Sequence, residues 1–130
     1  MANFSGLTAA RFSFLTSLTN CSNLQELDIG LNRFKGELPT LIANFSTTLQ
    51  QLIVGANQIS GSIPEGIKNL IGLPWLVISM NSITGEIPVG IGKLERLEDL
   101  SQLDNKISGE IPADLGNTTQ LGQLYLHTNN

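Results

Sequence analysis

The sequence contains very little of the chemistry on which most enzymes and metalloproteins depend. Its 130 residues include one cysteine and one histidine. The lone cysteine, Cys21, excludes an intrachain disulfide and any site built from several thiolates. The lone histidine, His127, leaves little for general base or metal chemistry. These counts predict a protein that is not an enzyme and that has no metal site and no cofactor.

Charge and long hydrophobic segments are also scarce. Charged residues make up 14% of the chain, and the formal net charge of −4 has the wrong sign for contact with a phosphate backbone or an anionic membrane surface. We therefore expect no nucleic-acid partner and no direct membrane contact. The longest apolar runs, such as Leu76-Val77-Ile78, are far shorter than the roughly 18 residues that span a bilayer. We expect neither a transmembrane segment nor a signal peptide in this sequence.

What the sequence does have is a repeat. Asparagines at positions 32, 57, 81, 105 and 129 lie 25, 24, 24 and 24 residues apart, and each closes a block of the form LxxLxLxxN. The apolar residues at the fourth and sixth places of the block are two apart, which is the spacing of side chains on one face of a strand. One short strand in every unit predicts stacked turns with a parallel sheet. The repeats cover residues 24–130, with units that start near 24, 49, 73, 97 and 121, and residues 1–23 form a degenerate leading partial repeat.

The first four blocks continue into a second motif, which reads NxxxGxIP, with leucine in place of isoleucine in the first. In the second unit it supplies Gly61, which allows a second bend, and Pro64, which can open a helical segment. Apolar residues three apart, such as Ile67 and Leu70, favour a 3-10 or short helical return behind the sheet. The amide of each repeat asparagine is expected to bond backbone groups where the chain turns after the strand.

Two positions stand out against this pattern. In the fourth unit the sixth place is Gln102, with Leu103 one step late, so we expect an amide to face inward and the strand to be locally irregular or less stable. Cys21 falls at the repeat phase of Leu70 and Leu94, which predicts a small buried residue rather than a reactive thiol.

The combined motif closely resembles the plant extracellular class of leucine-rich repeats over residues 24–130. The segment from Phe14 to Leu24 also resembles the ectodomains of cereal receptor-like kinases that include bacterial blight resistance receptors. The resemblance implies an α/β leucine-rich-repeat solenoid, with a curved parallel sheet on the concave face and short second strands and 3-10 or helical returns on the convex side. Since that family closes its solenoids with cysteine-paired caps, which these units lack, we expect an uncapped fragment.

The same resemblance implies a function. The repeats would form part of the ectodomain of a plant receptor-like serine/threonine kinase, at the extracellular face of the plasma membrane, in immune or peptide perception. Its partners would be a peptide or protein ligand and a co-receptor. Two alternatives stay open, namely a protein similar to the polygalacturonase inhibitors, which share this repeat class, and a truncated receptor fragment without function. A kinase encoded downstream would separate the first of these alternatives from a receptor.

Side chains that point outward from the strands form columns across the concave face, which is the predicted reading surface. The fifth-place column is Asp28, Ile53, Val77, Ser101 and Tyr125. Apolar residues gather near the middle of the face beside acidic ones, a composition typical of an interaction surface. The predicted ligand-binding residues are Asp28, Ile53, Trp75, Val77, Met80, Asp99, Tyr125 and His127. The alternative is that exposed apolar residues occur singly on any protein surface.

Four N-x-S/T sequons occur, at Asn3, Asn20, Asn44 and Asn117. The last three share one repeat phase just before the next strand, so they share one predicted exposure. We therefore expect Asn20, Asn44 and Asn117 to be glycosylation sites if the chain enters the secretory pathway. Asparagine at this phase can also serve turn chemistry alone.

Overall fold

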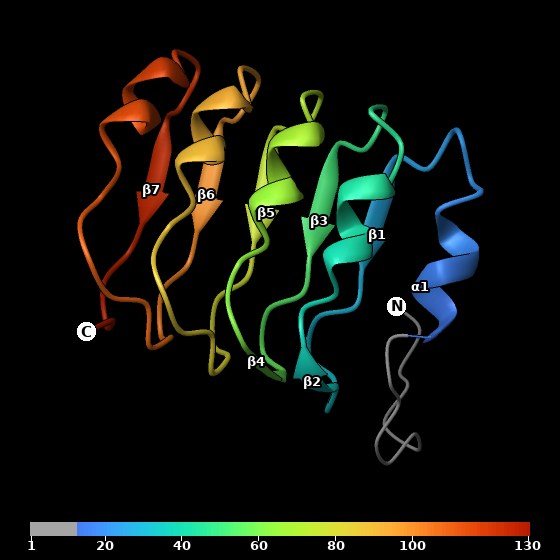
Figure 1. Cartoon of the computed structure of the whole chain (residues 1–130), viewed down its shortest axis with the longest axis horizontal. Coiled ribbons are helices and arrows are strands. Elements are labelled where there is room, and N and C mark those ends of the chain that lie inside the picture. Colours follow the sequence, from blue (N-terminus) through green and yellow to red (C-terminus); the bar gives the residue numbers. More distant parts are fainter. Residues whose placement is uncertain (1–12) are drawn as a thin grey trace.

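The computed structural model describes residues 13–130, which form a solenoid of stacked turns (Figure 1). Each turn gives one strand to a five-stranded parallel sheet with the order β1-β3-β5-β6-β7. The strands are β1 (Glu26–Asp28), β3 (Gln51–Ile53), β5 (Trp75–Val77), β6 (Asp99–Ser101) and β7 (Gln123–Tyr125). Neighbouring strands pair at the same repeat position, so Leu76 lies between Leu52 and Leu100. The predicted repeat period and parallel pairing are confirmed.

A second, smaller sheet forms in the first two repeat units, at the point where the chain turns from the five-stranded sheet toward the return segments. It contains β2 (Lys35–Glu37) and β4 (Gln58–Ser60), which are also parallel. The next turn continues the same hydrogen bonding without a regular strand, since the Ser82 amide donates to the Ile59 carbonyl at 2.8 Å. Gly61, with φ of 76°, supplies the left-handed bend expected of the glycine in the second motif.

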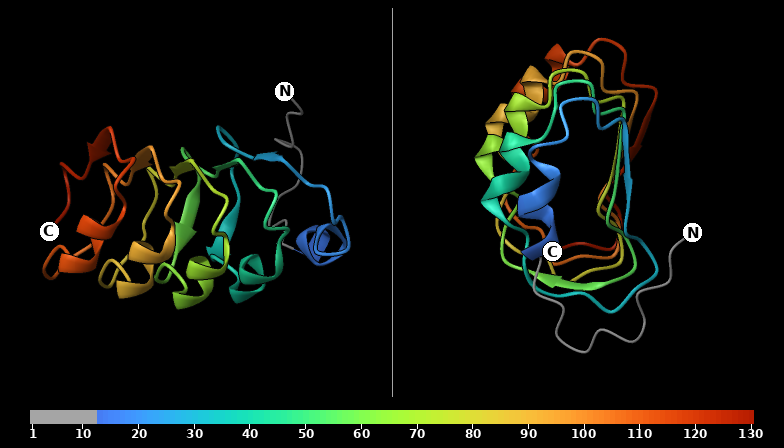
Figure 2. Two further views of the ribbon diagram at one scale, coloured as in Figure 1. Left: turned by 90° about the horizontal axis from the view of Figure 1, so that it is seen from above. Right: turned by 90° about the vertical axis from the view of Figure 1, so that its right-hand side faces the viewer.

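The chain returns through 3-10 helices on the side opposite the five-stranded sheet, and successive turns overlie one another when seen end-on (Figure 2). These helices are η1 (Thr40–Asn44), η2 (Glu65–Asn69), η3 (Val89–Lys93) and η4 (Ala113–Asn117). An extended proline precedes each of them, because its fixed φ and missing N–H suit the start of a helix. Ile67 and Leu70 are buried, so the predicted returns are confirmed.

The core runs the length of the solenoid between the sheet and the 3-10 helices. Leu52, Leu76 and Leu100 point into it from successive strands and are almost fully buried, and Ile67 and Ile91 meet them from the return segments. Each buried aliphatic side chain contributes about 1.5–3 kcal/mol relative to exposure. Since each turn is covered by its neighbours, stability is shared between adjacent units.

The repeat asparagines form the expected amide ladder. The Asn81 Nδ2 donates to the carbonyls of Val54 at 3.1 Å, Ile78 at 3.1 Å and Ser79 at 3.2 Å. Its Oδ1 accepts the Ile59 amide at 3.0 Å. Val54 and Ile59 belong to the preceding unit, so one side chain closes its own turn and bonds two backbone groups of the neighbouring turn.

The fourth unit corrects one expectation and confirms another. Gln102 does face inward, with 0% of its surface exposed. The strand beside it is regular, because β6 pairs in register on both sides. The backbone N–H of Gln102 also donates to the Tyr125 carbonyl at 2.8 Å. The departure is therefore confined to the side chain, whose Nε2 and Oε1 are buried without a hydrogen-bond partner among residues 13–130.

The segment that precedes the first strand is helical. Helix α1 (Ser13–Leu18) places Leu15 in the core, and its Phe14 ring lies 5.7 Å from that of Phe34. Cys21 follows the helix in a turn and is exposed, so the prediction of a buried cysteine was wrong. The backbone there still follows the repeat, since the Cys21 amide donates to the Leu18 carbonyl at 3.0 Å as the Leu70 amide does to the Ile67 carbonyl. Cys21 is exposed because it lies in the first described turn, which has a neighbouring turn on only one side within residues 13–130. Residues 1–12 of the predicted leading partial repeat lie outside the described residues.

None of the helices in residues 13–130 has the length and hydropathy needed to cross a membrane.

Candidate functional site

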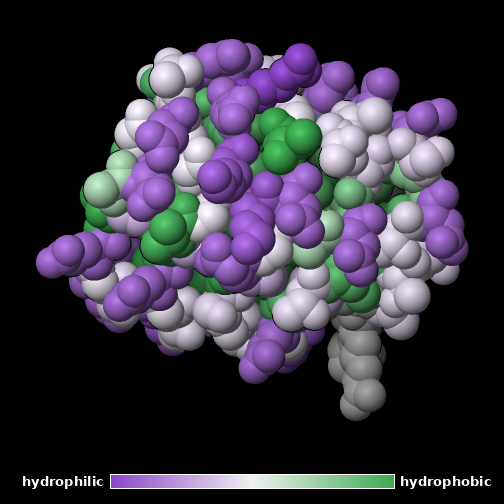
Figure 3. Space-filling model, turned by 45° about the horizontal axis from the view of Figure 1, so that its top comes forward, coloured by the Kyte–Doolittle hydropathy of each residue, from purple (hydrophilic) through white to green (hydrophobic). Residues whose placement is uncertain are grey.

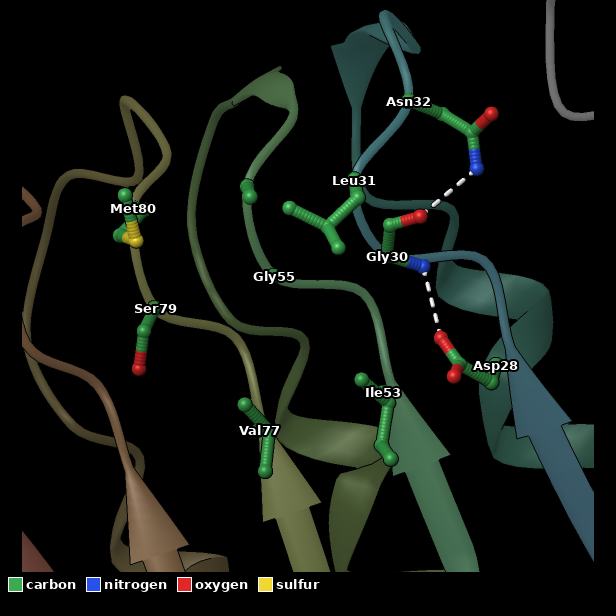
Figure 4. Close-up of a pocket in the computed structure, with 10 residues that line it drawn as sticks. Asp28, Gly30, Leu31, Asn32, Ile53, Gly55, Val77, Ser79 and Met80 are labelled. Carbon is green, nitrogen blue, oxygen red and sulfur yellow. Dashed lines mark hydrogen bonds between the residues drawn. The ribbon is translucent and has the colours of Figure 1, made fainter. Parts of the chain in front are cut away.

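A groove of about 510 Å³ crosses the C-terminal ends of β1, β3 and β5 (Figure 4). It runs from strand to strand, along the axis of the solenoid. Its lining comes from the fifth, seventh and eighth places of three consecutive units, with Asn32 from the ninth, so the repeat itself builds it. The residues that line it are Asp28, Gly30, Leu31, Asn32, Ile53, Gly55, Ala56, Val77, Ser79 and Met80.

The floor of the groove is formed at the seventh place of the repeat, where Gly30, Gly55 and Ser79 stand side by side. A Cβ added to Gly55 would lie 3.2 Å from the Ser79 carbonyl oxygen, and one added to Gly30 would lie 3.3 Å from the Gly55 carbonyl oxygen. Such approaches are tighter than most side chains accept. The missing side chains therefore hollow the surface at this level.

One wall is formed at the eighth place and was not predicted as a structural feature. Leu31, Ala56 and Met80 adopt φ values of 55°, 54° and 58°, a left-handed conformation that is uncommon for residues other than glycine. Leu31 is 75% exposed and Met80 is 55% exposed. The turn is held by backbone bonds between units, such as the Met80 amide to the Leu103 carbonyl at 2.9 Å. The left-handed bend thus presents apolar side chains to the groove.

The other wall carries three of the predicted ligand-binding residues. Ile53 and Val77 lie next to each other at the ends of β3 and β5 and are half-buried. Asp28 stands beside them on β1, and its Oδ1 accepts the Gly30 amide at 2.9 Å (Figure 4). Met80 faces this wall from across the groove. The structure therefore gathers Asp28, Ile53, Val77 and Met80 in one site.

The groove ends at the fourth unit. There the seventh place is Leu103, which is half-buried, instead of a glycine or serine. The fifth place is Ser101, predicted to face outward, which is buried with its Oγ 2.7 Å from that of Ser79. Ser101 pairs in register with Val77, so it does lie on the predicted outward face, but its hydroxyl and that of Ser79 are buried and bond each other there.

Trp75 and Asp99, also predicted to bind ligand, lie apart from the groove. They line a separate pocket of about 410 Å³ at the start of β5, β6 and β7, together with Glu98, Gln120, Gly122 and Gln123. Trp75 is 41% exposed. The Asp99 Oδ1 is buried and has no hydrogen-bond partner within residues 13–130.

Burial raises the pKa of the Asp99 carboxyl above its ordinary value, because desolvation disfavours the charged form. The native state therefore holds this proton more tightly than the unfolded chain does. The group favours folding below the ordinary pKa, and that contribution is lost as pH rises from there through the raised native pKa. Above the raised native pKa, the ionised carboxylate is a cost to the fold.

Tyr125 and His127 do not join either cavity. Both are exposed, and the Tyr125 hydroxyl donates to the Gln123 Oε1 at 3.2 Å. Within residues 13–130, no three histidine, cysteine or carboxylate side chains come together as a metal site would require. Elsewhere, hydrophobic side chains form separate patches among hydrophilic ones on the face shown in Figure 3.

The sequence matches the leucine-rich-repeat family model at residues 23–45 and 48–70. The described chain is a leucine-rich-repeat solenoid. Over 60 residues it is 55% identical to a putative receptor-like protein kinase of Arabidopsis thaliana, and over 62 residues it is 45% identical to the receptor kinase-like protein Xa21 of Oryza sativa subsp. japonica. The matched segments cover 46% and 48% of this chain.

This leucine-rich-repeat chain also resembles solved receptor ectodomains. The structure of the Arabidopsis receptor kinase HAESA, in complex with the peptide hormone IDA and the co-receptor SERK1, superposes with a TM-score of 0.82 and 34% sequence identity. The similarity covers 86% of this chain and 19% of the HAESA chain. The matched segments span only 6% of the length of each of the two receptor kinases above.

Proposed function

We propose that the chain is a peptide-binding module in the extracellular part of a plant receptor-like serine/threonine kinase. The observation that carries the proposal is the groove across β1, β3 and β5. Its walls are apolar except at Asp28, its floor is formed by glycine and serine, and it runs across the strand ends from Asp28 to Met80. Such a groove fits an extended peptide, with its side chains against Ile53 and Val77 and its backbone over the glycine floor.

The relatives support the same role. A peptide hormone and a co-receptor accompany the HAESA ectodomain, and the two similar sequences are receptor kinases. Catalysis belongs to the kinase domain of the parent receptor in this proposal, and the repeats supply recognition. A co-receptor is the second partner.

Filling the floor of the groove should weaken peptide binding. Leucine already occupies the seventh place at Leu103, so Ser79→Leu adds a bulky side chain that the repeat contains elsewhere. The substitution also removes the hydroxyl that bonds Ser101, so urea denaturation must first show that the variant is folded. We expect linear 12-residue peptides, selected against the chain from a random phage-displayed library, to bind this variant at least about tenfold more weakly, a loss of about 1.4 kcal/mol. Binding is measured by fluorescence polarisation.

A matched control is Val89→Ser, which removes an exposed apolar side chain from η3 on the opposite side. The selected peptides should bind it as they bind the original chain. Peptides that bind Ser79→Leu with unchanged affinity would show that the groove is not the recognition surface.

Glycosylation of Asn20, Asn44 and Asn117 is a further part of this proposal. All three are exposed, and Asn44 and Asn117 are the last residues of η1 and η4. They lie away from the groove, so glycans would leave it open. The fourth sequon, Asn3, lies outside the described residues.

Secretion of the chain from plant cells tests these sites. We expect glycopeptide mapping to find Asn117 modified, and Asn117→Gln to remove one mobility step that peptide N-glycosidase also removes. A secreted chain in which Asn117 carries no glycan would contradict the prediction.

A further inference from the structure

The pocket at the start of β5, β6 and β7 combines an aromatic face with acidic groups. Trp75 and Asp99 are register partners on adjacent strands, and Gln123 is the next partner along. Residues paired in register on one face lie about 5 Å apart. Glu98, which precedes Asp99, lines the same pocket, and neither lysine nor arginine is among its lining residues.

The charge of Asp99 is not compensated within the described residues. Along the same column, the Glu26 Oε1 accepts a hydrogen bond from the Gln51 Nε2 at 3.3 Å. The equivalent neighbour of Asp99 is Gln123, and the Asp99 Oδ1 is buried without a donor. Two carboxylates at the same repeat position therefore differ, since one has an internal donor and the other has an unpaired buried oxygen.

Asp99 as a residue is half-buried and lines the pocket, so a ligand can approach the carboxylate from the side of Oδ2, while Oδ1 stays buried. A cation placed there would gain an ion pair with Asp99 and a second attraction from the Trp75 ring, since a tryptophan face attracts cations. Glu98 adds negative charge at the same opening. A planar guanidinium can donate hydrogen bonds to a carboxylate oxygen and stack on an aromatic ring at the same time, which a compact metal ion cannot.

We propose that the pocket lined by Trp75, Glu98 and Asp99 binds the guanidinium of an arginine side chain in a peptide partner. This inference deepens the proposed function and rests on it for the nature of the partner. It adds a charge-selective subsite at the start of the strands, separate from the apolar groove at their ends. A peptide that uses both would cross the concave face obliquely.

Trp75 is the only tryptophan in the chain, so its fluorescence reports directly on this pocket. The probe is acetyl-Gly-Arg-Gly-amide, and the matched neutral probe is the same peptide with citrulline in place of arginine. We expect a saturable fluorescence change with arginine at low ionic strength, and an affinity at least about tenfold weaker with citrulline. Added salt should weaken the arginine response, because exposed ion pairs are screened.

Asp99→Asn should remove the preference for arginine over citrulline. Asp104→Asn serves as the control, because Asp104 is an exposed carboxylate that lines neither cavity. If Asp99→Asn does not fold, Glu98→Gln provides the same comparison and should reduce the preference. Equal responses to arginine and citrulline, or a preference that survives both substitutions, would overturn the assignment.

The tripeptide probes are too short to fill the groove, so this experiment is separate from the groove test. If the unsubstituted chain shows no preference for arginine over citrulline, while the selected peptides still bind Ser79→Leu more weakly, the pocket alone is rejected. The reverse pattern would reject the groove and keep the pocket.

Discussion

Replacing Gln102 with leucine stabilises the chain by about 1–3 kcal/mol, the range for relieving a buried polar group that has no hydrogen-bond partner. Both polar atoms of this amide are buried and unpaired in residues 13–130. Leucine restores the apolar residue that Ile29 and Ile78 provide at the same place. The backbone of β6 is already regular, so the substitution requires no rearrangement. Urea denaturation at neutral pH measures the gain.

Gln58→Leu is the matched control. It makes the same chemical change at an exposed position in β4, where surface substitutions usually change stability by less than about 0.5 kcal/mol. A loss of stability in Gln102→Leu, or an equal gain in both variants, would show that the buried amide carries no penalty.

Replacing Asn81 with alanine should destabilise the chain by about 2–4 kcal/mol, because buried backbone groups then lose their partner. The amide bonds three carbonyls and the Ile59 N–H. Two of these groups belong to the preceding unit, so the substitution weakens two turns together. It also releases the turn that holds Met80 in its left-handed conformation.

Asn69→Ala is the comparison for this variant. Asn69 is exposed, and its amide makes a single long contact of 3.4 Å to the Ala43 carbonyl. We expect a change below about 0.5 kcal/mol. Similar losses from Asn69→Ala and Asn81→Ala in urea denaturation would contradict the assignment of stability to the amide ladder.

The features predicted correctly from the sequence are those that repeat. The strands, the amide ladder and the proline-led returns each depend on residues within one unit, such as Asn57 and Pro64, and recur in the same phase. Cys21 shows the limit of this reasoning. It keeps the backbone bonding of the repeat but is exposed, because the first turn of residues 13–130 is covered on one side only.

The shape of the candidate site could be predicted less well from the sequence than the repeat could. Leu31 and Met80 are left-handed without any glycine to mark the bend, and the eighth place varies too widely in side-chain type to signal one. Trp75 belongs to the predicted outward set but lies in a different pocket from Val77. The reason is that the third place lies at the start of the strand and the fifth place at its end. The glycine and serine at the seventh place were the available signal for a groove floor.

The amide ladder also determines the order in which the turns are completed during synthesis. Asn57 bonds the Ile29 carbonyl and the Phe34 amide, which lie one unit earlier in the chain, and Asn129 does the same for Gln102 and Ile107. A turn therefore acquires its full set of bonds only after its successor has been made. On the ribosome, order would advance one repeat behind synthesis, and a pause between two asparagines would leave the latest turn open.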